Sequence, residues 1–168
     1  MYGNQNTMSA LAGGAGFAAG YAVAQMPPLH DRTTGKASVL VITCIDPRYT
    51  NDAAWFLSHN ASLHADYDLV TFAGAELGIL TKPNWRVMFM EHIELAKKLH
   101  NIKGVWCISH LDCGMYKATL DMATDDDGAV HINKMKELRV ELAMTHSDLT
   151  FRGFLISVKG ELKEVLLD

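Results

Sequence analysis

The stretch LVITCIDPRYT (residues 40–50) joins a short apolar run to three reactive side chains. Its first half is rich in β-branched residues, which is typical of a strand covered on both faces of a parallel sheet. Cys44, Asp46 and Arg48 then occupy alternate positions directly after this run. Ligands bind at the carboxyl ends of strands in open α/β sheets, so the stretch predicts a buried strand with a functional site at its end.

Similar apolar runs and helical patterns follow along the rest of the chain. Three runs resemble the first one: 66–74, 103–110 and 152–160. Asn84 is expected to cap a helix over 85–100, and apolar residues recur at helical spacing over 131–146. Strands that alternate with helices predict an α/β fold, with a parallel-dominated sheet of four to five strands layered by helices.

Length and composition limit the classes of protein to consider. A chain of 168 residues, 49% of them hydrophobic, can bury one core. The formal net charge of -4, with 15 basic and 19 acidic residues, leaves no electrostatic basis for binding nucleic acid. Three cysteines and the lack of a basic-then-apolar leader favour a reducing compartment, so we expect a cytoplasmic protein and no membrane partner.

The first thirty residues differ in composition from the remainder. Residues 1–30 contain no Asp, Glu, Lys or Arg and are rich in Ala and Gly. Small residues recur every four positions at Ala12, Gly16, Gly20 and Ala24, which on a helix would form one smooth face. We expect a helical arm over 1–30 that packs on a partner subunit, followed by one α/β domain over 31–168. A glycine-rich tail is the alternative, and a membrane span is less favoured because Leu and Ile are scarce.

Two thiols and an imidazole are expected to meet at one edge of the predicted sheet. Cys44 ends the first predicted strand, and His110 and Cys113 follow the third. Two thiolates and one imidazole match a Zn²⁺ site with three protein ligands, which leaves a fourth position for water or substrate. The alternative is that these cysteines are buried packing residues, the role we assign to Cys107 inside the third strand.

Asp46 and Arg48 leave the first strand on the same side as Cys44. A guanidinium can hold a carboxylate through paired hydrogen bonds, and an Asp held in this way stays ionised. Beside a metal, such a carboxylate can orient a nucleophile. The alternative is an ordinary salt bridge that closes the turn begun by Pro47.

The motifs CIDPR (44–48) and HLDCGMYKA (110–118) together resemble the CxDxR and HxxC signature of β-class carbonic anhydrases. The segment DLVTFAGAELG (68–78) is similar to the VxRNAG strand and loop of that family. The segment GFLISVKGELKEVL (153–166) resembles its last strand and hairpin. The resemblance extends over about residues 39–166.

This resemblance implies a reaction and a role for each site residue. Cys44, His110 and Cys113 would be the zinc ligands, and Asp46 and Arg48 the catalytic dyad. Zinc-bound hydroxide, oriented by Asp46, would hydrate CO2 reversibly to bicarbonate. Gly74 would lie in the loop beside the site, and backbone N–H groups from Gly114 onward could steady developing negative charge in the substrate pocket. The family also implies a dimer or higher homo-oligomer, and an aspartate able to swing onto zinc as a fourth ligand.

The chain departs from the family pattern near the site. Thr71 and Phe72 replace the usual Arg-Asn, Ala75 follows Gly74 where Asn or Gly is frequent, and Lys36 stands near the place of a substrate-contacting glutamine. Two alternatives therefore stand beside carbonic anhydrase. One is a hydrolase of carbonyl sulfide or carbon disulfide. The other is an assembly-forming or scaffolding protein on the same fold, with a structural zinc site and contacts made by the arm.

Overall fold

The computed structural model describes residues 35–121 and 128–168, which form a five-stranded sheet in the order β2-β1-β3-β4-β5. The strands are β1 (Val39–Cys44), β2 (Tyr67–Phe72), β3 (Gly104–His110), β4 (Thr150–Ile156) and β5 (Leu162–Val165). The first four run parallel, and β5 pairs antiparallel with β4 at the edge. The predicted α/β fold with a mostly parallel sheet is confirmed.

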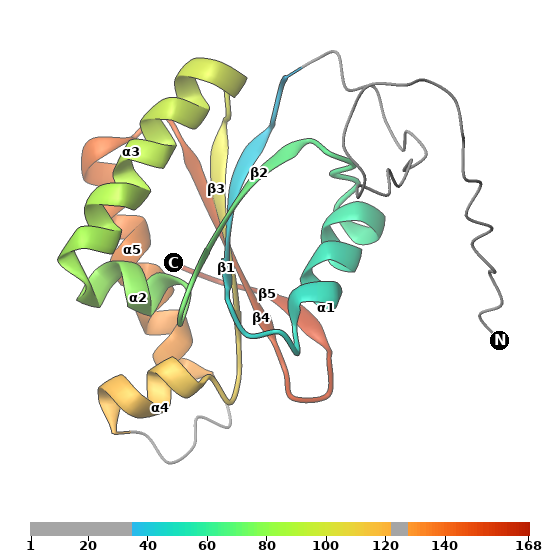
Figure 1. Cartoon of the computed structure of the whole chain (residues 1–168), viewed down its shortest axis with the longest axis vertical. Coiled ribbons are helices and arrows are strands. Elements are labelled where there is room, and N and C mark those ends of the chain that lie inside the picture. The colour runs from blue at the N-terminus through green and yellow to red at the C-terminus, as the bar shows by residue number, and fades with distance from the viewer. Residues whose placement is uncertain (1–34, 122–127) are drawn as a thin grey trace, which may run out of the picture.

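Helices cover both faces of this sheet (Figure 1). One face is covered by α1 (Thr50–Trp55) and the π-helical turn η1 (Phe56–Asn60). The opposite face is covered by α2 (Glu76–Thr81), α3 (Pro83–His100) and α5 (Ala129–Thr145). The short helix α4 (Gly114–Leu120) directly follows the loop after β3. Within the described residues, no helix is long and apolar enough to cross a membrane.

The alternation of side chains along β1 divides the core into two parts. Leu40 and Ile42 pack with α2, α3 and α5 in the larger cluster. Val39 and Val41 pack with α1 and η1 in the smaller one. Successive side chains of a strand point to opposite faces, so a strand with helices on both sides is apolar at consecutive positions. This explains the continuous apolar run from which the strand was predicted.

Several predicted boundaries differ from the structure, and two of the differences have a clear local cause. Asn84 does not cap α3, because the helix begins at Pro83 and Lys82 is the residue that precedes it in an extended conformation. Proline suits the first helical position, since its φ is already helical and its missing N–H has no helical partner there. The strand predicted over 152–160 ends at Ile156, and Gly160 (φ +80°) lies in the turn to β5.

The register of the sheet positions the candidate site. Thr43 of β1 is paired with Ile108 of β3, so Cys44 and His110 leave the sheet at the same edge. The arm predicted over residues 1–30 lies outside the described residues and stays a prediction. The predicted domain boundary at residue 31 also lies outside the described residues and stays a prediction.

Candidate metal centre

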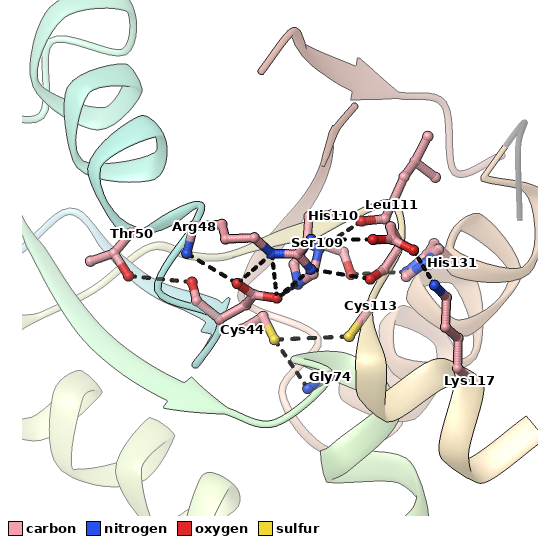
Figure 2. A network of polar contacts seen from close by, with 12 residues as sticks. Cys44, Arg48, Thr50, Gly74, Ser109, His110, Leu111, Cys113, Lys117 and His131 are labelled. Carbon is pink, nitrogen blue, oxygen red and sulfur yellow. Dashed lines mark hydrogen bonds and ion pairs between the residues drawn. The ribbon is translucent and has the colours of Figure 1, made fainter. Parts of the chain in front are cut away.

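Three possible metal ligands meet at the carboxyl ends of β1 and β3 (Figure 2). Cys44 ends β1, His110 ends β3, and Cys113 directly precedes α4. The two Sγ atoms lie 3.9 Å apart, and one donor atom from each of the three residues lies within 4.8 Å of the others. The structure therefore brings together the three residues that the sequence proposed as ligands.

The His110 ring is oriented so that one nitrogen remains available. Its Nδ1–H donates to the Leu111 carbonyl oxygen at 2.8 Å, which fixes the tautomer because a carbonyl can only accept. Nε2 is buried and has no hydrogen-bond partner among the described residues. Buried polar atoms are nearly always paired, so an unpaired nitrogen beside two sulfur atoms fits a metal ligand.

The sulfur atoms are held as a coupled pair. The Cys113 thiol lowers the pKa of Cys44 by donating a hydrogen bond to it, and this contact outweighs the opposing effect of burial. The same contact, followed by burial, raises the pKa of Cys113. The N–H of Gly74 also donates to Cys44 Sγ at 3.3 Å. Two sulfurs and one imidazole nitrogen suit zinc, with a fourth position open, and these residues fit that ion.

Gly74 is required where it lies, at the point where the loop after β2 approaches Cys44. Its φ is +72°, and a Cβ built there would lie 2.7 Å from Cγ of Met115. Both the left-handed backbone and the close approach disfavour a larger residue at this position. Gly74 therefore presents its N–H to the sulfur of Cys44.

Cys107 is separate from this cluster, as predicted. It is fully buried in the larger core, and its thiol donates to Glu76 Oε2 at 3.2 Å. Burial, together with the nearby carboxylate, raises the pKa of Cys107 well above the ordinary value. The thiol is therefore held in its neutral, unreactive form.

Asp46 and Arg48 form the predicted pair. Arg48 Nε donates to Asp46 Oδ1 at 3.0 Å, and Nη2 donates to Oδ2 at 2.7 Å. These bonds are the main cause that lowers the pKa of Asp46 to about 2. Asp46 Oδ2 lies 3.8 Å from Nε2 of His110. An ionised carboxylate thus faces the available nitrogen of a candidate ligand.

Asp112 extends this pair and was not among the predicted site residues. Its Oδ2 accepts from Arg48 Nη1 at 3.2 Å, and its carbonyl oxygen accepts from Nη2 at 3.3 Å. Lys117 donates to its other carboxylate oxygen. Asp112 stands inside the HxxC motif, between the two candidate ligands, and this position is the sequence feature that could have identified it. Arg48 therefore links the two motifs through carboxylates on both sides.

A cavity of about 260 Å³ opens beside Cys44 and His110. Besides Cys44 and His110, its wall consists of seven apolar residues and six Thr, Ser or Tyr residues. The remaining lining residues are Thr43, Ile45, Tyr49, Thr50, Ala53, Ala54, Leu57, Tyr67, Leu69, Thr71, Ile108, Ser109 and Ile156. Neither Gly74 nor Gly114 is among them, so their place in a substrate pocket stays a prediction. Gly114 begins α4 directly after Cys113.

The departures from the expected loop have structural explanations. Thr71 lines the cavity. Phe72 is buried and packs against the rings of Trp85 and Phe89, at 5.9 and 6.2 Å between centroids. Lys36 is exposed before β1, and the six residues of that strand span about 20 Å. Lys36 therefore lies near the amino end of β1, at the opposite end of the strand from Cys44. It cannot take the place of the substrate-contacting glutamine in the site of the same chain.

Comparison with known proteins gives the family. A family model described as "Putative carbonic anhydrase" matches residues 34–166, which is most of the chain. The chain therefore belongs to this carbonic anhydrase family, and the resemblance read from the two motifs is confirmed.

Relatives and solved structures show weaker similarity. Uncharacterized proteins of Rickettsia bellii and Rickettsia conorii are each 25% identical over 142 residues, which is 81% of this chain and 86% and 76% of theirs. The β-carbonic anhydrase CafA of Aspergillus fumigatus is similar at 15% identity and a TM-score of 0.49, over 79% of this chain and 76% of its own. A structure of tetrameric β-carbonic anhydrases from Sordaria macrospora gives 15% identity and a TM-score of 0.46, over 77% and 80%. The family assignment rests on the family model alone.

Proposed function

We propose that this protein is a zinc-dependent carbonic anhydrase that converts CO2 reversibly to bicarbonate. The observation that supports this most strongly is that donor atoms of Cys44, His110 and Cys113 lie within 4.8 Å of one another. Nε2 of His110 is buried there without a hydrogen-bond partner among the described residues. A structural zinc site would be expected to have four protein ligands, whereas three leave a position for chemistry. Membership of the carbonic anhydrase family supports the same reaction.

The metal would be held by the two sulfur atoms and His110 Nε2. Zinc in such a site lowers the pKa of bound water and so supplies a hydroxide nucleophile near neutral pH. The remaining roles belong to the chain. The hydrogen bond from His110 Nδ1 to Leu111 keeps the ring in the tautomer that leaves Nε2 free, and the N–H of Gly74 supports negative charge on Cys44.

Asp46 would orient the attacking group by accepting its hydrogen bond. Its pKa of about 2 means that the carboxylate is ionised at any pH near neutrality and can only accept. Arg48 holds both carboxylate oxygens, and Asp112 holds Arg48 from the other side. The Asp46 carboxylate is therefore fixed in direction, which favours a single geometry of attack.

The cavity suits a small apolar substrate. CO2 has no net dipole and needs little hydrogen bonding, and the walls around Leu57, Ile108 and Ile156 offer mostly apolar contact. The cavity lies directly beside Cys44 and His110. Substrate held there would be adjacent to the reacting centre.

The test is stopped-flow CO2 hydration by the purified chain, with zinc quantified in the same sample. We expect fast hydration with about one zinc per chain. Cys113→Ala should lose both the metal and the activity, whereas Cys107→Ala, outside the cluster, should keep both. Bound zinc without hydration in the native chain would contradict the proposal. Sulfur-containing analogues of CO2, or a purely structural role for the metal, would then be examined.

A further inference from the structure

Tyr49 stacks on one of the proposed zinc ligands, and no sequence pattern had selected it. Its ring centroid lies 4.2 Å from that of His110, with 23° between the two planes. Cζ of Arg48 lies 5.3 Å from the centroid of the same Tyr49 ring. We propose that Tyr49 is a positioning residue that holds the His110 imidazole in the orientation required to bind metal. The proposal rests on the proposed function only for the identity of the ion.

The His110 ring needs a contact of this kind because its outer side-chain torsion has broad, roughly twofold preferences. The hydrogen bond from Nδ1–H to the Leu111 carbonyl fixes one edge of the ring. A ring that is fixed only at one edge can still tilt about it. The flat face of Tyr49 opposes this tilt, so that Nε2 stays near the sulfur atoms of Cys44 and Cys113.

The backbone of Tyr49 is well placed to hold its ring still. Its N–H donates to the Asp46 carbonyl oxygen at 3.3 Å, and its own carbonyl oxygen accepts from the N–H of Ala53 at 3.0 Å. The residue therefore joins the turn that carries the Asp46–Arg48 pair to the first turn of α1. A rigid backbone on both sides is what a side chain needs if it is to orient another one.

The same ring connects the ligand to the proposed dyad. Arg48 approaches Tyr49 at a distance at which a guanidinium is attracted to an aromatic face. His110 lies within stacking distance of that ring. Groups that support metal ligands from outside typically change metal affinity by 10- to 100-fold when they are removed. Loss of the Tyr49 ring should therefore weaken zinc binding, even though Tyr49 itself offers no ligand.

Tyr67 provides a matched control. It is a partly buried tyrosine that lines the same cavity from β2. In the part of the chain that the structure describes, the aromatic ring stacked on His110 is that of Tyr49, not Tyr67. Truncating Tyr67 removes the same atoms from the same cavity without touching the ligand.

The experiment measures zinc affinity of the full chain by competition with a chromophoric chelator, and records the visible spectrum of the cobalt(II)-loaded protein. Tyr49→Ala should weaken zinc binding by roughly tenfold or more and change the cobalt spectrum. Tyr49→Leu, which keeps most of the bulk but offers no flat face, should weaken zinc binding in the same direction. Tyr49→Phe keeps the ring, so its zinc affinity should stay within about twofold of the native value. The zinc affinity of Tyr67→Ala should stay within the same range.

Two results would overturn the proposal. One is native zinc affinity and an unchanged cobalt spectrum in folded Tyr49→Leu. The other is an equal loss of affinity in Tyr67→Ala, which would mean that the cavity as a whole, and not the stacked ring, supports the site. Neither readout involves CO2, so the proposal about Tyr49 can fail while the proposed reaction stands, and the reverse also holds.

Discussion

Five side chains make up the candidate site: Cys44 and His110 are the last residues of β1 and β3, and Asp46, Arg48 and Cys113 lie in the loops that follow. Cys44, His110 and Cys113 were proposed from their spacing, and the structure places their donor atoms within 4.8 Å of one another. Asp46 and Arg48 are two residues apart, so their pairing needed only local geometry. Contacts of this kind follow from the strand ends and the sheet topology alone.

Supporting residues could not be predicted in the same way. Arg48 and Asp112 are separated by 64 positions along the chain. Glu76 is fully buried, although nothing around it in the sequence distinguishes it from a surface acid. Its partners come from residues 31 and 40 positions away. Such contacts depend on how helices pack across the sheet, which periodicity does not specify.

At the residue scale, we predict that protons compete with zinc for the sulfur ligands. In the metal-free site the Cys113 thiol is protonated, because its contact with Cys44 raises its pKa. Zinc needs deprotonated ligands, so binding must release that proton, and affinity must fall as pH falls. We expect a loss of roughly tenfold per pH unit below neutrality for each proton released.

Calorimetry in buffers with different ionisation enthalpies measures this release directly. At least about one proton per zinc is expected at pH 7. A zinc affinity that does not change between pH 8 and about 6 would contradict the account of the sulfur pair.

At the scale of elements, Glu76 joins three segments that surround the metal centre. It stands at the start of α2, accepts from the Tyr116 hydroxyl of α4 at 2.5 Å and accepts from the Cys107 thiol of β3 at 3.2 Å. His131 Nδ1 of α5 lies 3.8 Å from Glu76 Oε1. Burial, followed by the nearby Glu76 charge, raises the pKa of Tyr116, so its hydroxyl stays a donor. The short helix that follows Cys113 is thereby tied to the core.

Removing one of these donors should destabilise the fold. Tyr116→Phe leaves a buried carboxylate oxygen of Glu76 with one donor fewer, which costs about 1–3 kcal/mol of unfolding free energy. Urea denaturation of the metal-free protein measures this loss. Tyr67→Phe is the control, because the Tyr67 hydroxyl makes no hydrogen bond within the described residues and its removal leaves no buried acceptor without a donor. Equal stability of the two variants would contradict the role given to Glu76.

Element boundaries show where local patterns were insufficient. The four parallel strands and the two long helices were predicted from their apolar patterns, and all of them are present, whereas β5 was expected only from the family resemblance. The start of α3 was missed because Asn84 looked like a cap, whereas Pro83 already occupies the first helical position. The end of β4 was missed because Val158 looks like a further apolar strand residue, although it already lies in the turn that includes Gly160.

At the scale of the whole molecule, the parallel sheet explains why one edge holds every proposed catalytic group. Cys44 and His110 come from adjacent parallel strands, and the loops that follow them bring in Asp46, Arg48 and Cys113. The antiparallel β5 lies at the far edge of the sheet and takes no part in the site. Self-association, a cytoplasmic location and the arm over residues 1–30 stay predictions.

The role of Asp46 in hydration is tested by comparing CO2 hydration by Asp46→Asn with that of the native chain, at equal and quantified zinc content. The substitution keeps the shape of the side chain but removes the charge that Arg48 holds. We expect the variant to keep its zinc and to hydrate CO2 roughly a hundredfold or more slowly than the native chain. A variant that hydrates CO2 as fast as the native chain, with the same zinc content, would contradict this role of Asp46.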